Sequence, residues 1–424
     1  MKKLLPVLLF WGAAYLVAAQ DTGLRYEDYI YKPNIKTVQF HLDGLPVSYP
    51  IIDLNSNSVL KLSFDDLDGD AKNYTYRIIH CDINWQPSNL AEMEYIEGFM
   101  EDRIEDFRFS FKTLKSYTHY EFFLPNRSMT WTKSGNYLLK IYEDERQKAL
   151  AITRRFVVVE PIVRITPKMM RPNQVGKIRT HQEIDFVVDH QRLNIRAPLQ
   201  EIRAVVLQNG RWDNAIGDLA PLFARGEQMI FDFQDRVIFP GGKEFRFIDF
   251  RTLRARNQQI ASIERFDDTY EVVLHKDQKR SNQTYLQSRD VNGKFVIETF
   301  DQQDSDITAN YADVFFSLYC PEPYYDHELY VFGAMSDWQL KPEFKMAYNP
   351  AINGYVVKVP LKQGFYDYAY ARVPINAKRK VADLSEIEGD WHETENLYTI
   401  LLYYNPFGER YHRVIGAVTF SSNM

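Results

Sequence analysis

Residues 64–85, FDDLDGDAKNYTYRIIHCDINW, contain two strand-like runs separated by an aspartate-rich turn. Leu60, Leu62 and Phe64 share one face of the first run, which is typical of a strand with one side on a core. Asp68-Gly69 is a turn pair that supplies the positive φ angle of a tight hairpin. The stretch therefore predicts paired strands at the start of a longer β block that runs to about Glu160.

The same period-two pattern recurs along the chain. Tyr120, Phe122 and Leu124 share a face, as do Phe245 and Phe247. Aromatic residues make up 15% of the sequence, which favours pleated, half-buried surfaces. We therefore expect an all-β protein of antiparallel β-sandwiches, immunoglobulin-like or early-set in type. Further turn signals separate the runs: Ser134-Gly135-Asn136, Asn209-Gly210, Asn292-Gly293 and Asn353-Gly354.

The length of 424 residues suggests several domains at about 150 residues each. One boundary is expected at Glu160-Pro161, where a strand gives way to a loop-like segment. Another is expected at the polar stretch 301–310, before an apolar strand. Three consecutive sandwich domains follow, each large enough for its own core: residues 20–160, 161–305 and 306–424.

The first nineteen residues predict a cleaved secretory signal peptide. Lys2 and Lys3 precede an apolar run, and small residues end at Ala19 before the polar Gln20. The run is short for a membrane span, and Gln20 in place of Cys does not support a lipoprotein anchor. No later stretch approaches the roughly 20 apolar residues of a transmembrane helix. We expect an exported protein that does not itself span a membrane.

Charge and cysteine content exclude several classes of function. Without the two lysines of the signal peptide, the formal net charge falls from −6 to −8. An acidic chain is a poor candidate for binding nucleic acid or anionic lipid, which need a basic surface. Cys81 and Cys320 are expected to be small buried hydrophobic residues instead of a disulfide.

The aspartates of FDDLDGD invite comparison with a calcium loop. Asp66, Asp68 and Asp70 match the first three ligand positions of an EF-hand, but Ala71 and Arg77 stand where Gly and Glu are required. A capped hairpin turn explains the same residues, so no metal site is predicted.

The run His80-Cys81-Asp82 contains three reactive residue types, but neighbours on a strand point to opposite faces. A Cys–His pair completed by a distant residue stays open. The sequence has no P-loop, GxGxxG or GxSxG motif. We expect no enzyme activity, cofactor, or small-molecule substrate.

Residues 87–106 differ from the rest in being acidic and poor in β-branched residues. Asn89 followed by Glu92 predicts a short helix with a capping box, ending near Gly98. A solvated loop or edge-covering helix is favoured, and an acidic docking surface is the alternative.

The C-terminal part carries one resemblance. The segments 330–338 (YVFGAMSDW), 354–355 and 364–370 are similar to glycogen-binding, early-set immunoglobulin-like modules. The resemblance implies a sandwich fold and makes Trp338 and Trp391 candidate sugar platforms. The basic and amide residues that grip sugar hydroxyls in those modules have no counterpart. A periplasmic or surface carbohydrate-binding module protein is therefore the alternative function.

A second resemblance covers nearly all of the chain after the signal peptide. Its motifs include FDDL at 64–67, the run 74–85, and residues 117–126 and 134–142. Further motifs follow at 244–246, 290–295, 312–318, 394–398, 403–404 and 410–411. Together these resemble the plug proteins of type IX secretion. The residues that carry the family signature are structural: Phe64, Asp65, Asp66, His80, Cys81, Asp82, Trp85, Gly135 and Asn136.

This resemblance implies a non-enzymatic periplasmic protein on the inner side of the outer membrane. Plug proteins bind the large outer-membrane translocon barrel of type IX secretion and close its periplasmic opening when no substrate is engaged. The matching motifs do not identify the residues that contact this partner.

Overall fold

The computed structural model describes residues 23–144, 149–191 and 193–423, and it is an all-β protein of packed, mostly antiparallel sheets. The predicted signal peptide and its cleavage position at Ala19 and Gln20 lie outside the described residues. Within the described ranges, no helix has the length and hydropathy needed to cross a bilayer. The all-β sandwich prediction is confirmed.

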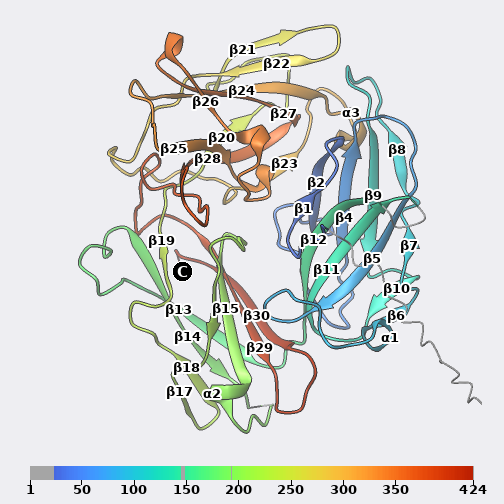
Figure 1. The fold of residues 1–424 in the computed structure, drawn as a ribbon, viewed down its shortest axis with the longest axis vertical. Helices are drawn as coiled ribbons and strands as arrows, with labels where there is room; N and C mark the ends of the chain where they lie inside the picture. The colour runs from blue at the N-terminus through green and yellow to red at the C-terminus, as the bar shows by residue number, and fades with distance from the viewer. Residues whose placement is uncertain (1–22, 145–148, 192, 424) are drawn as a thin grey trace, which may run out of the picture.

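Three packed units lie around a common centre (Figure 1). The first unit spans residues 23–160. The second unit contains residues 161–240 together with 397–421. The third unit is formed by residues 241–396, and each unit has its own hydrophobic cluster.

The first unit is a two-sheet sandwich. One sheet has the order β1 (Tyr29–Ile30), β12 (Leu150–Val159), β11 (Gly135–Glu143), β5 (Tyr74–Cys81) and β7 (Asp102–Arg103), and β3 (Ile51–Asp53) runs parallel to β12. The other has the order β2 (Ile35–Leu42), β4 (Leu60–Asp66), β9 (Thr118–Leu124) and β8 (Phe107–Phe109). The pair β6 (Ile96–Gly98) and β10 (Met129–Trp131) follows the short helix α1 (Glu92–Tyr95).

The second unit is built from two distant parts of the chain. One sheet contains β13 (Arg164–Met170), β14 (His181–Asp189), β18 (Gln228–Phe231), β17 (Phe223–Arg225) and, beside β14, β19 (Ile238–Pro240). The other has the order β16 (Ile216–Leu219), β15 (Ile202–Gln208), β29 (Leu397–Tyr404) and β30 (Arg413–Ser421), with α2 (Pro198–Glu201) before β15.

The third unit packs a long strand, β28 (Gly364–Pro374), against a five-stranded sheet. β28 pairs with β20 (Arg246–Asp249), β23 (Phe295–Ile297) and β25 (His327–Phe332). The sheet has the order β21 (Ile260–Arg265), β22 (Tyr270–Leu274), β24 (Tyr311–Tyr319), β27 (Gly354–Lys362) and β26 (Ala347–Asn349). Short helices complete the unit: α3 (Ser305–Thr308), η1 (Ala334–Ser336), η2 (Pro342–Phe344) and η3 (Pro350–Ile352).

Strand pairing divides the chain differently from the expected boundary at residue 305. β22, before that boundary, pairs with β24 after it, and β29 pairs with β15 across nearly two hundred residues. The polar stretch 301–310 lies at a contact between units instead of in a linker, since its helix α3 packs near β9. We therefore propose a discontinuous second domain in place of the predicted 161–305 and 306–424 segments.

Most of the predicted alternation is present. Leu60, Leu62 and Phe64 are buried, and the Tyr120, Phe122 and Leu124 face is buried too, as expected. Between Phe245 and Phe247 the prediction of a shared core face is wrong at the second residue, because Ile248 fills the core and Phe247 is only partly buried.

The predicted short helix exists but begins later and is capped differently. α1 spans Glu92–Tyr95, and the backbone N–H of Ala91 donates to Glu94 Oε2 over 2.8 Å. The expected cap, Asn89, therefore lies outside the helix, which ends well before Gly98.

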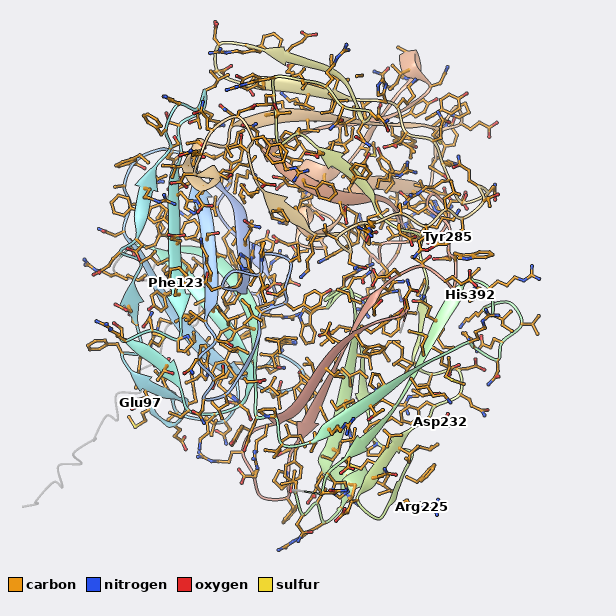
Figure 2. All side chains as sticks on the ribbon, turned by 180° about the vertical axis from the view of Figure 1, so that it is seen from behind. Glu97, Phe123, Arg225, Asp232, Tyr285 and His392 are labelled. Carbon is orange, nitrogen blue, oxygen red and sulfur yellow. The ribbon has the colours of Figure 1, made fainter. Side chains whose placement is uncertain are left out.

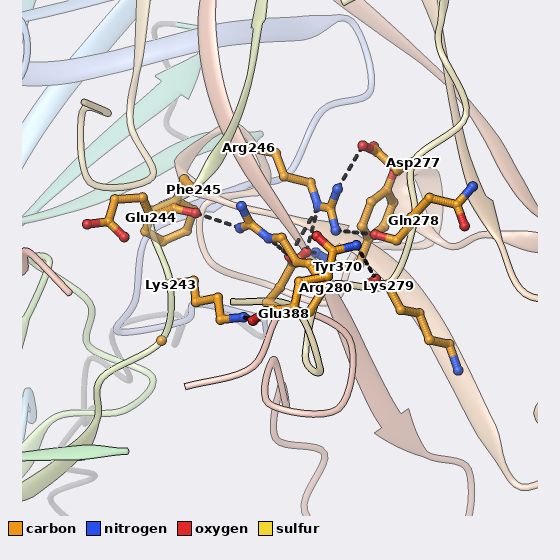
Figure 3. A network of polar contacts seen from close by, with 12 residues as sticks. Lys243, Glu244, Phe245, Arg246, Asp277, Gln278, Lys279, Arg280, Tyr370 and Glu388 are labelled. Atoms are coloured by element: carbon orange, nitrogen blue, oxygen red, sulfur yellow. Dashed lines mark hydrogen bonds and ion pairs between the residues drawn. The ribbon is translucent and has the colours of Figure 1, made fainter. Parts of the chain in front are cut away.

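A partly buried ion-pair network organises the third unit around the buried Glu388 (Figure 3). Arg246, on β20, lies 2.7 Å from Asp277 and 3.0 Å from Glu388. Arg280 donates to the other oxygen of Glu388, and the Tyr370 hydroxyl donates to Asp277 over 2.7 Å. Burial opposes ionisation of Glu388, but the two arginines hold its pKa below the usual value. The network fastens the loop around Glu388 to β20 and β28.

Asp367 holds the turn that precedes β23. Its carboxylate accepts hydrogen bonds from the N–H groups of Val291 (2.6 Å) and Gly293 (3.1 Å). Gly293 has φ +79°, and a Cβ there would meet the Trp338 ring at 2.2 Å, so the turn requires glycine. Burial, with Asp290 nearby, raises the pKa of Asp367 to about 8.

The raised pKa of Asp367 predicts a pH-dependent loss of stability. The folded protein retains a proton that the unfolded chain releases above about pH 4, so the free energy of unfolding falls as pH rises towards about 8. The slope from this residue is at most about 1.4 kcal/mol per pH unit. Asp367→Asn keeps an oxygen acceptor for the two N–H groups and removes this titration. Urea unfolding at several pH values should give a shallower decline for the variant, and parallel curves would contradict this assignment.

Candidate functional site

Asp65, from the FDDL motif, lies in a buried contact between the first and third units. Its Oδ2 is 2.7 Å from Lys362 Nζ and accepts a 2.7 Å hydrogen bond from the Tyr311 hydroxyl. Its Oδ1 is 2.7 Å from His119 Nδ1. Burial opposes ionisation of Asp65, but the Lys362 ammonium and the His119 hydrogen bond hold its pKa below the usual value. The motif therefore connects two units that are far apart in the sequence.

Aromatic and main-chain groups surround this pair. The Lys362 ammonium lies 4.2 Å from the centre of the Tyr117 ring. The Tyr117 hydroxyl donates to the carbonyl of Ala309 over 2.9 Å, and the N–H of Phe111 donates to the carbonyl of Ile307 over 2.8 Å. The segment around α3 is thus fastened directly to the first unit.

A second contact between these units involves a charge that is mostly buried. Arg154, on β12, is 5% exposed and lies 3.1 Å from Asp337. Lys341 also pairs with Asp337, over 2.5 Å. Lys294 donates to the carbonyls of Val47 and Ser48 over 2.6 and 2.8 Å. Two separate sets of contacts therefore resist rotation of the third unit about the first.

The first and second units meet through an apolar cluster that contains Cys81 and Trp85. The Tyr403 hydroxyl donates to Asn136 Oδ1 over 2.8 Å, and Asn136 Nδ2 donates to the Asp82 carbonyl over 2.9 Å. Four of the family-signature residues thus lie at or next to this junction. Further members of the cluster come from both units: Leu138, Val157, Val159, Val205, Leu207, Leu401 and Val414.

His80 points to the opposite side of β5 from Cys81, as the strand alternation predicts. Its ring packs against Tyr137 inside the first unit, and its Nε2 lies 3.2 Å from the Ser134 carbonyl. Burial lowers the pKa of His80 to about 4 and raises that of the Cys81 thiol to about 12. A reactive thiolate needs the reverse shifts. A Cβ at Gly135 would lie 2.3 Å from His80 Nε2, so glycine allows this close packing.

The remaining motif aspartates stabilise the turn. Asp66 accepts hydrogen bonds from the Asp68 N–H (3.0 Å), Asn34 Nδ2 (2.6 Å) and the Tyr74 hydroxyl (2.8 Å), and it pairs with Lys72. Phe64 stacks on Tyr120 within the core, at a centroid distance of 5.1 Å. Both cysteines are buried and unpaired, which confirms that prediction.

The two candidate sugar platforms lie in different surroundings. Trp338 is partly buried, with Phe332 and Phe245 at its edges and the Arg211 guanidinium 4.9 Å from its ring centre. Trp391 is stacked on Tyr285 at 5.9 Å. Figure 2 shows Tyr285 and His392, the neighbour of Trp391, close together beside the junction of the second and third units. Sugar binding at either ring stays a prediction.

An exposed phenylalanine row marks the outer edge of the first unit. Phe107, Phe109 and Phe111 are 40%, 54% and 56% exposed. β8 is the last strand of its sheet and pairs only with β9 among the described strands. The Asp106 carbonyl accepts from the Glu121 N–H on β9, and the Ser110 N–H donates to the carbonyl of Tyr117 just before β9. Strand alternation therefore turns the main-chain groups of Phe107 and Phe109 to the open edge.

Acidic side chains lie around the phenylalanine row. Glu105 and Asp106 are exposed directly before it, whereas Glu97, on β6, lies at the far corner of the same unit (Figure 2). This row was not predicted, although the alternation FRFSF at 107–111, directly after the acidic segment 87–106, is a signal for it. An open strand edge with exposed aromatic side chains is suited to binding another protein.

Comparison with known proteins identifies the first unit. Residues 35–160 match the family model described as the type 9 secretion system plug protein 1st domain. A search of the curated proteins finds no match.

Solved structures extend the likeness beyond the first unit. A crystal structure of a hypothetical protein from Parabacteroides merdae ATCC 43184 is 32% identical, with a TM-score of 0.89, and the alignment covers 94% of this chain and 100% of that one. Native alpha-2-macroglobulin from Escherichia coli, spanning domains NIE-MG1, is 12% identical over 42% of this chain and 80% of that one, with a TM-score of 0.16. Because the family match falls on the first unit and the P. merdae likeness spans the three, the chain belongs to the family of type 9 secretion system plug proteins.

Proposed function

We propose that this protein binds the outer-membrane translocon barrel of type IX secretion from the periplasm and closes its opening when no substrate is engaged. The observation that carries the proposal is the locking of three units into one body by buried contacts. A body that seals a wide pore must keep its shape, since a hinge between units would open a leak.

The contacts between units support this rigidity through their burial. Asp65 and Lys362 are each 1% exposed, so separating the units would expose an ion pair that water now hardly reaches. Arg154–Asp337 and the Asn136–Tyr403 hydrogen bond act at other points of the same first unit. Fixing one unit at several separate points removes the freedom to rotate about any one of them.

The phenylalanine row is the surface that we propose for contact with the barrel. Phe107 and Phe109 lie on the edge strand β8, so a partner strand can add there while the exposed rings fill apolar pockets. The N–H of Phe111 already donates to the Ile307 carbonyl, so Phe111 contributes its ring alone. A reversible plug needs an interface of moderate size with a polar rim, which the surrounding acidic residues supply. The family motif at residues 134–142 does not belong to this surface. Its Gly135 packs against the His80 ring inside the first unit.

The first test is partner capture. The tagged mature protein, incubated with gently solubilised outer membrane, should recover one very large barrel protein. Deletion of its gene should make cells permeable to large antibiotics that are normally excluded. Recovery of no membrane protein, together with an unchanged permeability barrier, would refute the proposed function.

The phenylalanine row is tested by substitution. Phe109→Ser with Phe111→Ser should weaken barrel capture about tenfold or more, equivalent to about 1.4 kcal/mol. Because both rings are more than half exposed, thermal stability should change little. Phe223→Ser, on a 48% exposed ring of the second unit, is the matched control and should leave capture unchanged. Equal capture by all variants would show that the barrel binds to a surface other than the phenylalanine row.

The locking of the units is tested at Lys362. Lys362→Met leaves the Asp65 carboxylate without its buried cation and should lower the free energy of unfolding by about 3–5 kcal/mol. Adding Asp65→Asn should recover part of this loss, since the uncompensated charge is removed. Lys358→Met, which breaks the more exposed Lys358–Asp313 pair, should cost at most about 1 kcal/mol.

The same variants report on shape. Small-angle X-ray scattering should show a larger radius of gyration for Lys362→Met than for the wild-type protein and the Lys358→Met control. A Lys362→Met protein with wild-type stability and size would show that this pair does not hold the units together.

A further inference from the structure

The two ring nitrogens of His119 differ: Nδ1 is hydrogen-bonded, and Nε2 has no hydrogen-bond partner among the described residues. The residue lies on β9 and is 5% exposed. Its Nδ1 is 2.7 Å from Asp65 Oδ1, while its Nε2 is buried with no hydrogen-bond partner among the described residues. A neutral imidazole that donates from Nδ1 to a carboxylate presents a lone pair at Nε2. Histidines that bind metals commonly have this arrangement.

The free nitrogen faces two carboxylates from different units. Glu121 follows on β9, and Asp306 belongs to α3 of the third unit. One ligand atom from each of the three residues lies within 4.8 Å of the other two, and Asp306 Oδ2 is 3.9 Å from His119 Nε2. The three residues thus converge at the contact between the units.

We propose that His119, Glu121 and Asp306 form a binding site for a divalent transition-metal ion of the zinc class, completed by water. Imidazole nitrogen and carboxylate oxygen are both zinc ligands, with bonds about 2.0–2.2 Å long, and water can fill an open position. In a tetrahedral site the ligand atoms then lie roughly 3.4 Å apart, so Asp306 Oδ2 must approach closer than its present 3.9 Å from His119 Nε2. The two carboxylates can move in by rotation, since the Glu121 and Asp306 side chains are 23% and 38% exposed.

A lysine ammonium lies beside the two carboxylates, where the metal ion would bind. Lys61 Nζ lies 2.6 Å from Glu121 and 3.8 Å from Asp306. Arg108 also pairs with Asp306, over 3.4 Å. A metal ion must displace Lys61, whose side chain is 20% exposed and can turn outwards.

The consequence of metal binding follows from the origin of the ligands. Two ligands come from the first unit and one from the third. A bound ion would therefore add metal–ligand bonds across the contact between these units, which the Asp65–Lys362 ion pair already stabilises. Sequence spacing gave no hint of the site, because His119 and Asp306 are joined only by the fold. The site does not depend on the identity of the secretion partner.

Competition between the metal and Lys61 gives a test with two opposite outcomes. The metal-free mature protein is titrated with Co²⁺ and Zn²⁺, and binding is followed by the visible spectrum of Co²⁺ and by calorimetry. The wild-type protein should bind one ion. His119→Gln and Asp306→Asn should each weaken binding by tenfold or more, whereas Lys61→Met should tighten it. A variant that is merely misfolded cannot gain affinity.

His190→Gln is the matched control. His190 is also buried with an unpartnered Nε2, but its Nδ1 lies 3.0 Å from the Leu193 carbonyl and it belongs to no cluster of potential ligands among the described residues. Its substitution should leave binding unchanged. Absence of saturable binding to the wild-type protein would overturn the proposal, as would wild-type affinity in both His119→Gln and Asp306→Asn.

Discussion

Asp65 and Lys362 hold opposite charges at a point from which water is almost excluded. Two ions in such a place are stable only when their charges and hydrogen-bonding groups are matched, and separating them is strongly unfavourable. Asp65 is matched on both oxygens, by Lys362, Tyr311 and His119. The position of the third unit against the first depends on this match, because the ion pair is satisfied in one relative placement only.

Local chemistry explains what the sequence could predict. The alternation of Leu60, Leu62 and Phe64 is a property of consecutive residues, so it identified a buried strand face. The role of Asp65 was missed because its partner, Lys362, is nearly three hundred residues away and carries no local signal. The discontinuous second unit was missed for the same reason, since β15 and β29 pair across the whole third unit. At β20 the pattern failed because Ile248, not Phe247, faces the core.

The family-signature residues acquire a common meaning from their positions. Asp65 lies between the first and third units, and Cys81, Trp85 and Asn136 lie between the first and second. Others, such as Phe64, Asp66 and His80, stabilise the strands that carry them. The motif that looked chemical in the sequence, with its Asp, His and Cys, therefore acts by joining units together. The surface proposed for partner contact is formed by different residues.

The return of the chain to its second unit has a consequence for the order of folding. Residues 161–240 supply β13 to β19, but β15 lacks its neighbour until β29 has emerged at the far end of the chain. A chain delivered from its N-terminus can complete the first unit early, because all of that unit's strands precede residue 160. The second unit must wait, with an uncovered strand edge, until the last residues arrive. Exposed edges of this kind favour aggregation, so we expect the folding chain to be most prone to aggregation before β29 and β30 dock.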